Sequence, residues 1–144
     1  MKKLLLLPLL CLLLSAGCGD RGFAPLPEEP TAFELTGFQN PADPDDGYMA
    51  LEYEGRVYLP YGTLAGRIGR SDVAECLGYL VQDGIADENA RIYTLAADPA
   101  HNYLMDDYEG GEMMQPIFWR AADTAGEAID TPDYIDDLGY AFWQ

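Results

Sequence analysis

The chain has few basic residues, and this limits the classes of molecule that it can bind. Of 144 residues, 25 are acidic and only 8 are basic, which gives a formal net charge of −17 at pH 7. Both lysines, Lys2 and Lys3, lie at the very start, so every later basic residue is an arginine. Because nucleic-acid binding depends on clustered lysine and arginine side chains, this composition excludes nucleic acid as a partner. It is compatible with a bound cation or a basic protein.

Residues for nucleophilic and metal chemistry are also scarce. Past residue 18 the chain has one histidine, His101, one serine, Ser71, and one cysteine, Cys76. A catalytic serine or cysteine needs a nearby base, and a zinc site needs several Cys, His or carboxylate ligands. We expect Ser71 to cap a helix and burial to raise the pKa of the Cys76 thiol. No glycine-rich phosphate loop is present, so we assign no catalytic residue and no cofactor.

The N-terminal residues have the pattern of an export signal. Two lysines precede an apolar run over residues 4–14, which is shorter than the roughly 20 residues that a helix needs to cross a bilayer. The small residues Ser15, Ala16 and Gly17 follow, and Cys18 comes next. The pattern predicts a cleaved signal peptide over residues 1–17 rather than a transmembrane helix.

The end of this signal resembles the lipobox of bacterial lipoproteins, although Leu14 lies one place earlier than the leucine of the commonest form. The resemblance implies that Cys18 becomes the N-terminus and carries a diacylglyceryl group and a further acyl chain such as palmitate. The protein would then be anchored outside the cytoplasm, on the cell membrane or the outer membrane. Each buried CH₂ adds about 0.8 kcal/mol, so two or more chains make the anchor stable. The alternative is an ordinary secretory signal with an incidental cysteine.

The rest of the chain fits a tether and one domain. Residues 18–31 are rich in glycine and proline, a composition that stays extended and buries little surface. Residues 32–144 have the length of a single globular domain. With Cys11 in the signal and Cys18 lipidated, Cys76 has no disulfide partner within the chain. We therefore expect core packing alone to stabilise this domain.

Strand patterns dominate the predicted domain. The clearest is a hairpin in which residues 48–53 and 56–61 flank Glu54 and Gly55, with aromatic and β-branched residues around a tight turn. A simple register would mix polar and apolar residues on each face, so we expect a bulge at Gly55. Pro60 favours an edge position for the second strand.

Further strands are expected at residues 33–38, 76–81, 91–96 and 102–105, with a turn over residues 82–90. Residues 115–122 fit either strand or helix, while Ser71 and residues 131–138 favour two short helices. The predicted fold class is α+β and β-rich: a single antiparallel curved sheet or small barrel with one or two short helices.

The body also resembles small uncharacterised lipoproteins of bacterial surfaces. Two segments carry this resemblance, namely Glu75-Cys76-Leu77-Gly78-Tyr79 and Arg91-Ile92-Tyr93. It implies no activity.

One loop offers ligands for a hard cation. Asp43, Asp45 and Asp46 supply the oxygen atoms that calcium prefers. The spacing does not match an EF-hand, because Tyr48 stands where the glycine would fall counting from Asp43. The three residues are calcium candidates, and the alternative is a solvated turn before a strand.

Tyrosines gather in the predicted hairpin. Tyr48, Tyr53, Tyr58 and Tyr61 all lie there, and rigid amphipathic rings give large contact area at low entropy cost. We expect one face of the hairpin to present them as an aromatic contact patch for an envelope protein or a glycan. The alternative is that the rings belong to the core.

Two functions remain open at this stage. The first is a lipid-anchored extracytoplasmic binding or protein-interaction module, which fits the anchor, the tether and the poverty of catalytic residues. The alternative is a carboxylate-dependent hydrolase or carbohydrate-active enzyme at the cell envelope. A pocket that holds two carboxylates in unlike environments would favour the enzyme. An exposed aromatic patch would favour the interaction module.

Overall fold

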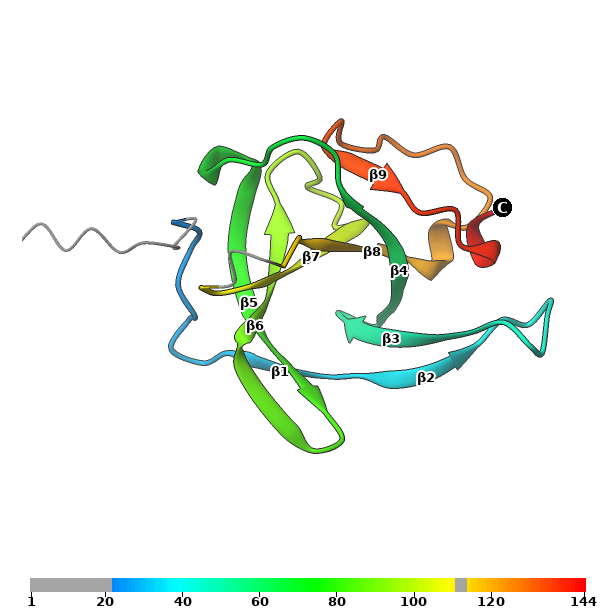
Figure 1. Cartoon of the computed structure of the whole chain (residues 1–144), viewed down its shortest axis with the longest axis horizontal. Helices are drawn as coiled ribbons and strands as arrows, with labels where there is room; N and C mark the ends of the chain where they lie inside the picture. Colours follow the sequence, from blue (N-terminus) through cyan, green and yellow to red (C-terminus); the bar gives the residue numbers. More distant parts are fainter. Residues whose placement is uncertain (1–21, 111–113) are drawn as a thin grey trace, which may run out of the picture.

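The computed structural model describes residues 22–110 and 114–144, which fold around one curled, strand-rich sheet (Figure 1). The strands are β1 Thr31–Glu34, β2 Thr36–Gln39, β3 Gly47–Tyr53, β4 Arg56–Leu64, β5 Val73–Gln82, β6 Ile85–Leu95, β7 Tyr103–Tyr108, β8 Ile117–Ala121 and β9 Ile135–Asp137. The helical segments in this part of the chain are 3-10 turns: η1 Arg70–Asp72, η2 Ala122–Thr124 and η3 Ala141–Trp143. The β-rich class is confirmed, but the described residues contain no α-helix, so α+β does not strictly apply.

The sheet runs in the order β1-β5-β6-β7-β8-β4-β3-β2, and β9 also pairs with β4. Neighbouring strands are antiparallel except β1 and β5, which are parallel. The two ends of this order, β1 and β2, are successive parts of one segment with only Leu35 between them. The segment pairs with β5 through β1 and with β3 through β2. One stretch of chain therefore connects both ends of the curled sheet.

Both faces of the sheet are covered, which explains why strict polar and apolar alternation is weak in the sequence. One cluster fills the concave face and draws on strands from both ends of the order; its buried members are Phe33, Leu51, Tyr58, Ile92, Leu104, Trp119 and Ala121. A second cluster contains the strand neighbours of these residues, such as Tyr93, Tyr103 and Phe118, together with Ile135 of β9. Because successive side chains of a strand point to opposite faces, the second cluster lies on the other face.

The predicted hairpin is present, but its details differ. Tyr53 pairs with Arg56 across the turn, and Glu54 and Gly55 have φ values of 50° and 76°. Positive φ at both central residues is the geometry of a two-residue hairpin turn that matches strand twist. The simple register is therefore the one adopted, and the predicted bulge at Gly55 is wrong.

Pro60 is not on an edge strand, because β4 pairs with β8 on one side and, on the other, with β3 through residues 56–58 and with β9 through residues 62–64. The register with β8 shifts between Pro60 and Gly62. A bulge of this kind tolerates a residue without a backbone N–H donor. The edge prediction from Pro60 is thus wrong, and the irregularity occurs inside β4.

Neither predicted helix forms. The 3-10 turn η1 is closed by the carboxylate of Asp72, which accepts a 2.7 Å hydrogen bond from the Gly69 amide, so Ser71 is not the cap. β5 begins at once with the buried Val73. Residues 131–138, expected as a helix, instead contain β9, because Ile135 is buried against the sheet and pairs with Leu64. Tertiary contacts outweigh these short helix signals, since an isolated short helix has little stability of its own.

The chain does turn within residues 82–90, but the turn is confined to Asp83 and Gly84, since β5 and β6 form a long hairpin around these two residues. Residues 115–122, which fitted either strand or helix, contain strand β8 and the first residue of η2.

Part of the predicted tether packs on the body. Phe23, Ala24 and Leu26 lie against the second cluster, and the ring of Phe23 meets Tyr93 edge-on with centroids 5.5 Å apart. Packing therefore begins several residues before position 32. The predicted signal peptide and Cys18 lie outside the described residues. Within the described part, no helix is long and apolar enough to cross a membrane.

Candidate functional site

The four tyrosines of the predicted patch do not share a surface. Tyr58 is 0% exposed and Tyr61 is 7% exposed, and they belong to the two different core clusters. Tyr53 is half-buried between Phe33 and His101. Only Tyr48 lies beside exposed aromatic residues. The predicted patch of Tyr48, Tyr53, Tyr58 and Tyr61 is therefore wrong, because packing on both faces of the sheet buries positions that a one-sided hairpin would expose.

A different aromatic surface forms where the β2–β3 ribbon meets the end of the chain. We call it the aromatic ledge and define it as Phe38, Tyr48, Tyr140 and Phe142 with the neighbouring Leu138; Met49 follows Tyr48 in β3 and points to the other face of the ribbon. Ring centroids lie 5.5 Å apart for Phe38 and Phe142 and 5.8 Å apart for Tyr48 and Tyr140. The Phe142 amide also donates a 3.2 Å hydrogen bond to the Tyr48 hydroxyl. These contacts fix the ledge before any ligand arrives.

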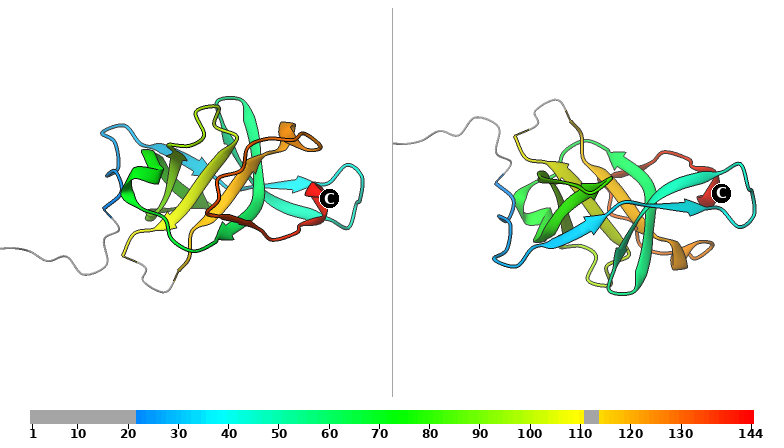
Figure 2. Two further views of the ribbon diagram at one scale, coloured as in Figure 1. Left: turned by 90° about the horizontal axis from the view of Figure 1, so that it is seen from above. Right: turned by 90° about the horizontal axis from the view of Figure 1, so that it is seen from below.

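The ledge is both exposed and prominent. Leu138 is 51% exposed and Tyr140 is 36% exposed. The ribbon extends beyond the body with the C-terminal turn beside it (Figure 2). A shallow groove of about 450 Å³ on the ribbon is lined by Gly37, Phe38, Gln39, Gly47, Tyr48 and Met49. No side chain at Gly37 or Gly47 fills this groove, so a ligand can approach the backbone.

The calcium candidates form the turn at the tip of the ribbon. The Asp43 carboxylate accepts a 2.9 Å hydrogen bond from the Asp45 amide, and the Asp46 carboxylate accepts a 2.7 Å hydrogen bond from the Asn40 side chain. Across residues 22–110 and 114–144, no three His, Cys, Asp or Glu side chains are grouped so that they could hold a metal ion. In the described structure, the hydrogen bonds of these aspartates therefore stabilise a turn, and the carboxylates do not surround a cation position.

A second candidate site is a pocket of about 200 Å³ beside β7, lined by Leu80, Asp87, Ala90, Asp106, Tyr108, Met114, Gln115 and Ile117. Burial, and then the nearby charges of Asp107 and Asp87, raise the pKa of Asp106 to about 7. The Asp87 carboxylate also accepts a 3.1 Å hydrogen bond from the nearby backbone amide of Asn89. The pocket therefore holds two carboxyl groups in unlike surroundings.

Sequence reasoning missed both Asp106 and Asp87. Asp106 falls at the start of a run of acids that reads as a loop, whereas it lies in β7 between the buried Met105 and Asp107. The alternation of Leu104, Asp106 and Tyr108 on one face of a strand is the signal that could have identified it.

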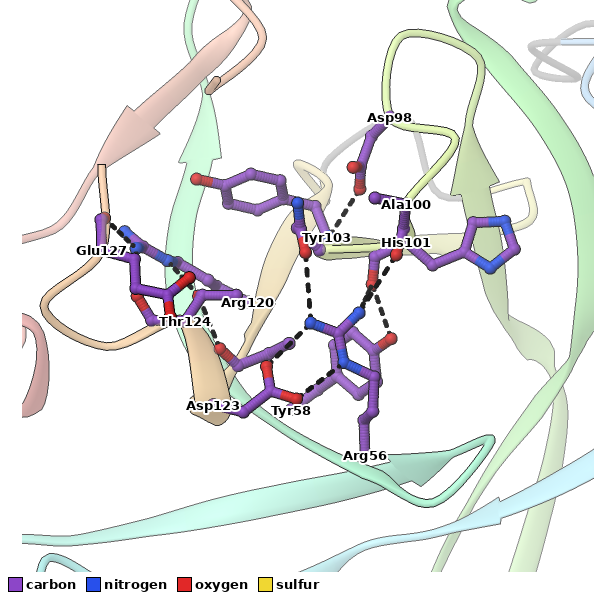
Figure 3. Close-up of polar contacts among 12 residues, drawn as sticks. Arg56, Tyr58, Asp98, Ala100, His101, Tyr103, Arg120, Asp123, Thr124 and Glu127 are labelled. Carbon is purple, nitrogen blue, oxygen red and sulfur yellow. Dashed lines mark hydrogen bonds and ion pairs between the residues drawn. The ribbon is translucent and has the colours of Figure 1, made fainter. Parts of the chain in front are cut away.

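Two arginines hold the loops at one end of the sheet (Figure 3). Arg56 donates to the backbone carbonyls of Ala100 and His101 at 3.1 and 2.9 Å and to the Asn102 side chain at 3.1 Å. The Tyr58 hydroxyl donates a 2.6 Å hydrogen bond to the same His101 carbonyl. Burial raises the pKa of Tyr58 to about 12, so this hydroxyl remains a donor. These polar groups are already hydrogen-bonded within the chain, so they hold the loop in place and do not form a ligand site.

Arg120 is a buried arginine that, like Arg56, holds a loop through hydrogen bonds. Its guanidinium donates to the Thr124 hydroxyl and carbonyl at 2.8 and 2.9 Å, and it also reaches the Glu127 carbonyl at 3.2 Å (Figure 3). It also lies over the rings of Tyr61 and Trp143, 5.3 and 4.9 Å from their centroids. Arg120 thus ties the C-terminal turn to β4 and β8.

The remaining candidates for nucleophilic chemistry stay apart. Cys76 is buried, which raises the pKa of its thiol as expected, and its sulfur lies 3.8 Å from the Gly78 carbonyl. His101 stands at a turn with φ of 53° and its Nδ1 lies 3.9 Å from the Glu54 carboxylate. Ser71 is exposed. Each of these three residues contacts different neighbours, so they do not form a nucleophile–base pair with one another in the described structure.

Comparison of the chain with protein-family models, with curated proteins and with solved structures found no significant match.

Proposed function

We propose that the protein is a lipid-anchored, extracytoplasmic interaction module that binds an envelope protein through the aromatic ledge. The observation that carries this proposal is the exposure of Leu138 and Tyr140 on the C-terminal segment, where the ring of Tyr140 packs against Tyr48 of the protruding ribbon. Exposed apolar side chains that lie close together on a protein surface commonly mark a contact surface. Tyrosine and other aromatic residues are enriched in the fully buried centres of protein interfaces.

The rigidity of the ledge supports the same function. Stacked rings and the Phe142–Tyr48 hydrogen bond hold its side chains in place. A preformed surface loses less conformational entropy when a partner binds, so more of the contact energy appears as affinity.

The position of the ledge also suits an anchored protein. Residues 22–30 lie at the opposite end of the long axis from the ribbon tip (Figure 1). Because packing begins at Phe23, the five residues from Cys18 could span at most about 18 Å. An anchor on Cys18 would therefore keep that end near the bilayer and direct the ledge away from it.

Site-specific photo-cross-linking in intact cells tests this function. A photoreactive residue would replace Leu138 or Tyr140 in the full-length chain, and Ile85 would serve as the matched control because it is 73% exposed at a different hairpin. We expect the same protein adduct from positions 138 and 140 and none from position 85. Cys18→Ala should remove the protein from the membrane fraction and abolish the adduct. Adducts that do not differ among the three positions would contradict the proposal.

The pocket beside β7 supports a second proposal, a carboxylate-dependent hydrolase acting on glycosidic bonds. With a pKa of about 7, Asp106 would hold a proton that it donates to the leaving oxygen as the C–O bond breaks. Asp87 would accept a proton from the water that adds to the sugar carbon. A carboxyl group whose pKa is raised by burial, with a second carboxyl group nearby to act as the base, is the arrangement that this chemistry requires.

Hydrolysis of α- and β-linked aryl glycosides by the purified protein tests this second function. We expect turnover that Asp106→Asn abolishes and that the distant control Asp45→Asn retains. Failure of every aryl glycoside, or turnover that survives Asp106→Asn, would exclude this role for the pocket.

A further inference from the structure

We infer that the segment bound at the aromatic ledge is basic and extended, with aliphatic or aromatic side chains between its lysines or arginines. This inference rests on the proposed interaction function and adds the chemistry of the partner.

The first argument is charge. Asp43 and Asp45 are exposed at the tip of the ribbon, and Asp136 and Asp137 are exposed just before Leu138. The sequence has no lysine or arginine between residues 22 and 55 or between residues 121 and 144. In the described part of the chain, the ion pairs involve Arg56, Arg91 and His101, and none includes these four aspartates. The ledge is therefore apolar at its centre and negative at its margins, which is complementary to a basic segment.

The second argument is the chemistry of aromatic rings. The faces of Tyr48 and Tyr140 carry partial negative charge, so a lysine or arginine of the partner gains a cation–π contact there. The protein already uses this interaction next to the ledge, where the Arg120 guanidinium lies 4.9 Å from the centre of the Trp143 ring. Phe142 of the ledge packs against that same tryptophan at 4.7 Å. Long basic side chains can also lay their methylene stems on Leu138 while the charged ends reach the aspartates.

The third argument is the free edge of the ribbon. β2 pairs with β3 on one side and is the last strand of the described order on the other. A peptide can add to such an edge as a further strand and gain backbone hydrogen bonds. Gly37 on β2 has open space where a Cβ would stand, with no atom within 4 Å. An extended segment can therefore approach β2 closely.

Peptide binding to the full-length lipidated protein in zwitterionic nanodiscs tests the inference. One probe is a ten-residue peptide that alternates lysine with valine and tyrosine, and the second probe has glutamate in place of each lysine. We expect the basic peptide to bind at least about tenfold more tightly than the acidic one, with an affinity that falls as salt rises.

Variants locate the binding. Asp43→Asn/Asp45→Asn removes two charges but keeps the oxygen that accepts from the Asp45 amide, and it should weaken binding of the basic peptide at least about threefold. Leu138→Ser should weaken it as well. The control Asp83→Asn/Glu88→Gln, which removes two charges from the β5–β6 hairpin, should leave the affinity unchanged.

Equal binding of the two peptides, or loss of affinity in the control as large as in Asp43→Asn/Asp45→Asn, would overturn the inference. A neutral oligosaccharide that occupies the ledge while the basic peptide does not would overturn it in favour of a glycan. The proposed function fails separately, when positions 138 and 140 give no specific adduct. A specific adduct whose cross-linked segment is acidic or neutral would retain the interaction function and reject the basic partner.

Discussion

Arg56 and Asp123 meet through two parallel hydrogen bonds, 2.9 and 2.7 Å long, although 67 positions separate them in the chain. The hydrogen bonds from Arg56 lower the pKa of the Asp123 carboxyl. The same guanidinium also holds the carbonyls of Ala100 and His101. One side chain of the β3–β4 hairpin thereby fixes two loops that come from later parts of the chain.

Replacing either partner of this pair should have unequal effects. Asp123 is largely exposed, so Asp123→Asn should lower the free energy of unfolding by less than about 1 kcal/mol. Arg56→Gln also deprives two backbone carbonyls and Asn102 of a donor, and should cost about 2 kcal/mol. Urea denaturation followed by tryptophan fluorescence measures both values. Equal losses of unfolding free energy in the two variants would show that the ion pair, rather than the hydrogen bonds to the loop, accounts for the stabilisation.

Gly78 is expected to be essential for docking of the first strand. A Cβ at this position would lie 1.8 Å from the carbonyl oxygen of Thr31, a backbone atom of β1. β1 would have to move away from β5, so Gly78→Ala should lower the free energy of unfolding by about 3 kcal/mol. Faster proteolysis near residue 31 should accompany this loss.

Gly37→Ala is the matched control, because nothing lies within 4 Å of its Cβ position. The substitution also reduces the conformational freedom of the unfolded chain, so stability should stay the same or rise slightly. A loss as large as that of Gly78→Ala would mean that glycine is needed for strand geometry in general rather than for the close approach of β1.

Asp106 should make the protein less stable as the pH rises from about 4 to about 7. Its pKa is about 7 in the folded protein, whereas an unfolded aspartate has a pKa of about 3.9. Between these values the folded state keeps a proton that the unfolded state has released, so the free energy of unfolding falls with rising pH and levels off above about 7. Denaturation midpoints at a series of pH values measure the slope.

The variant Asp106→Asn cannot ionise and should remove this part of the pH dependence. Asp123 has a lowered pKa, so its stabilising contribution is present at neutral pH and is lost as the pH falls into the acidic range; the small effect of Asp123→Asn on stability should therefore disappear in acid and leave the slope between pH 4 and 7 unchanged. An unchanged slope between pH 4 and 7 in Asp106→Asn would assign the dependence to other groups.

Cys76 should react slowly with thiol reagents in the native protein. Its side chain is buried, and burial raises the pKa of the thiol, so little thiolate is present and little is accessible. We expect maleimide labelling to proceed at the rate of unfolding, more than about 100-fold slower than in denaturant. Fast labelling of the folded protein would contradict the burial of β5 at this point.

Local patterns predicted the parts of the fold that depend on local sequence. The Glu54-Gly55 turn was predictable because positive φ at two successive residues selects such a pair. The buried, unreactive character of Cys76 was predictable because its neighbours are apolar. The short helices at Ser71 and at residues 131–138 were wrong, since pairing of β5 and β9 with distant strands overrides weak local preferences.

The candidate sites depend on contacts between distant parts of the chain. Tyr58 and Tyr48 look alike in sequence, yet one is fully buried and the other lies beside Tyr140 and Phe142. The pKa of Asp106 is raised first because folding buries its carboxyl group, and then because the charges of Asp107 and of Asp87 on another strand lie nearby. No local pattern contains those long-range contacts.

The continuity of β1 and β2 has a mechanical consequence. Tension between residues preceding β1 and a partner held on the ribbon would run along the axis of this one segment. The hydrogen bonds between β1 and β5 lie across that axis, so the load would fall on all of them together instead of peeling them apart one by one. The domain would then resist a steady pull along this line better than a pull on its C-terminal turn, as expected of a link that must bear force.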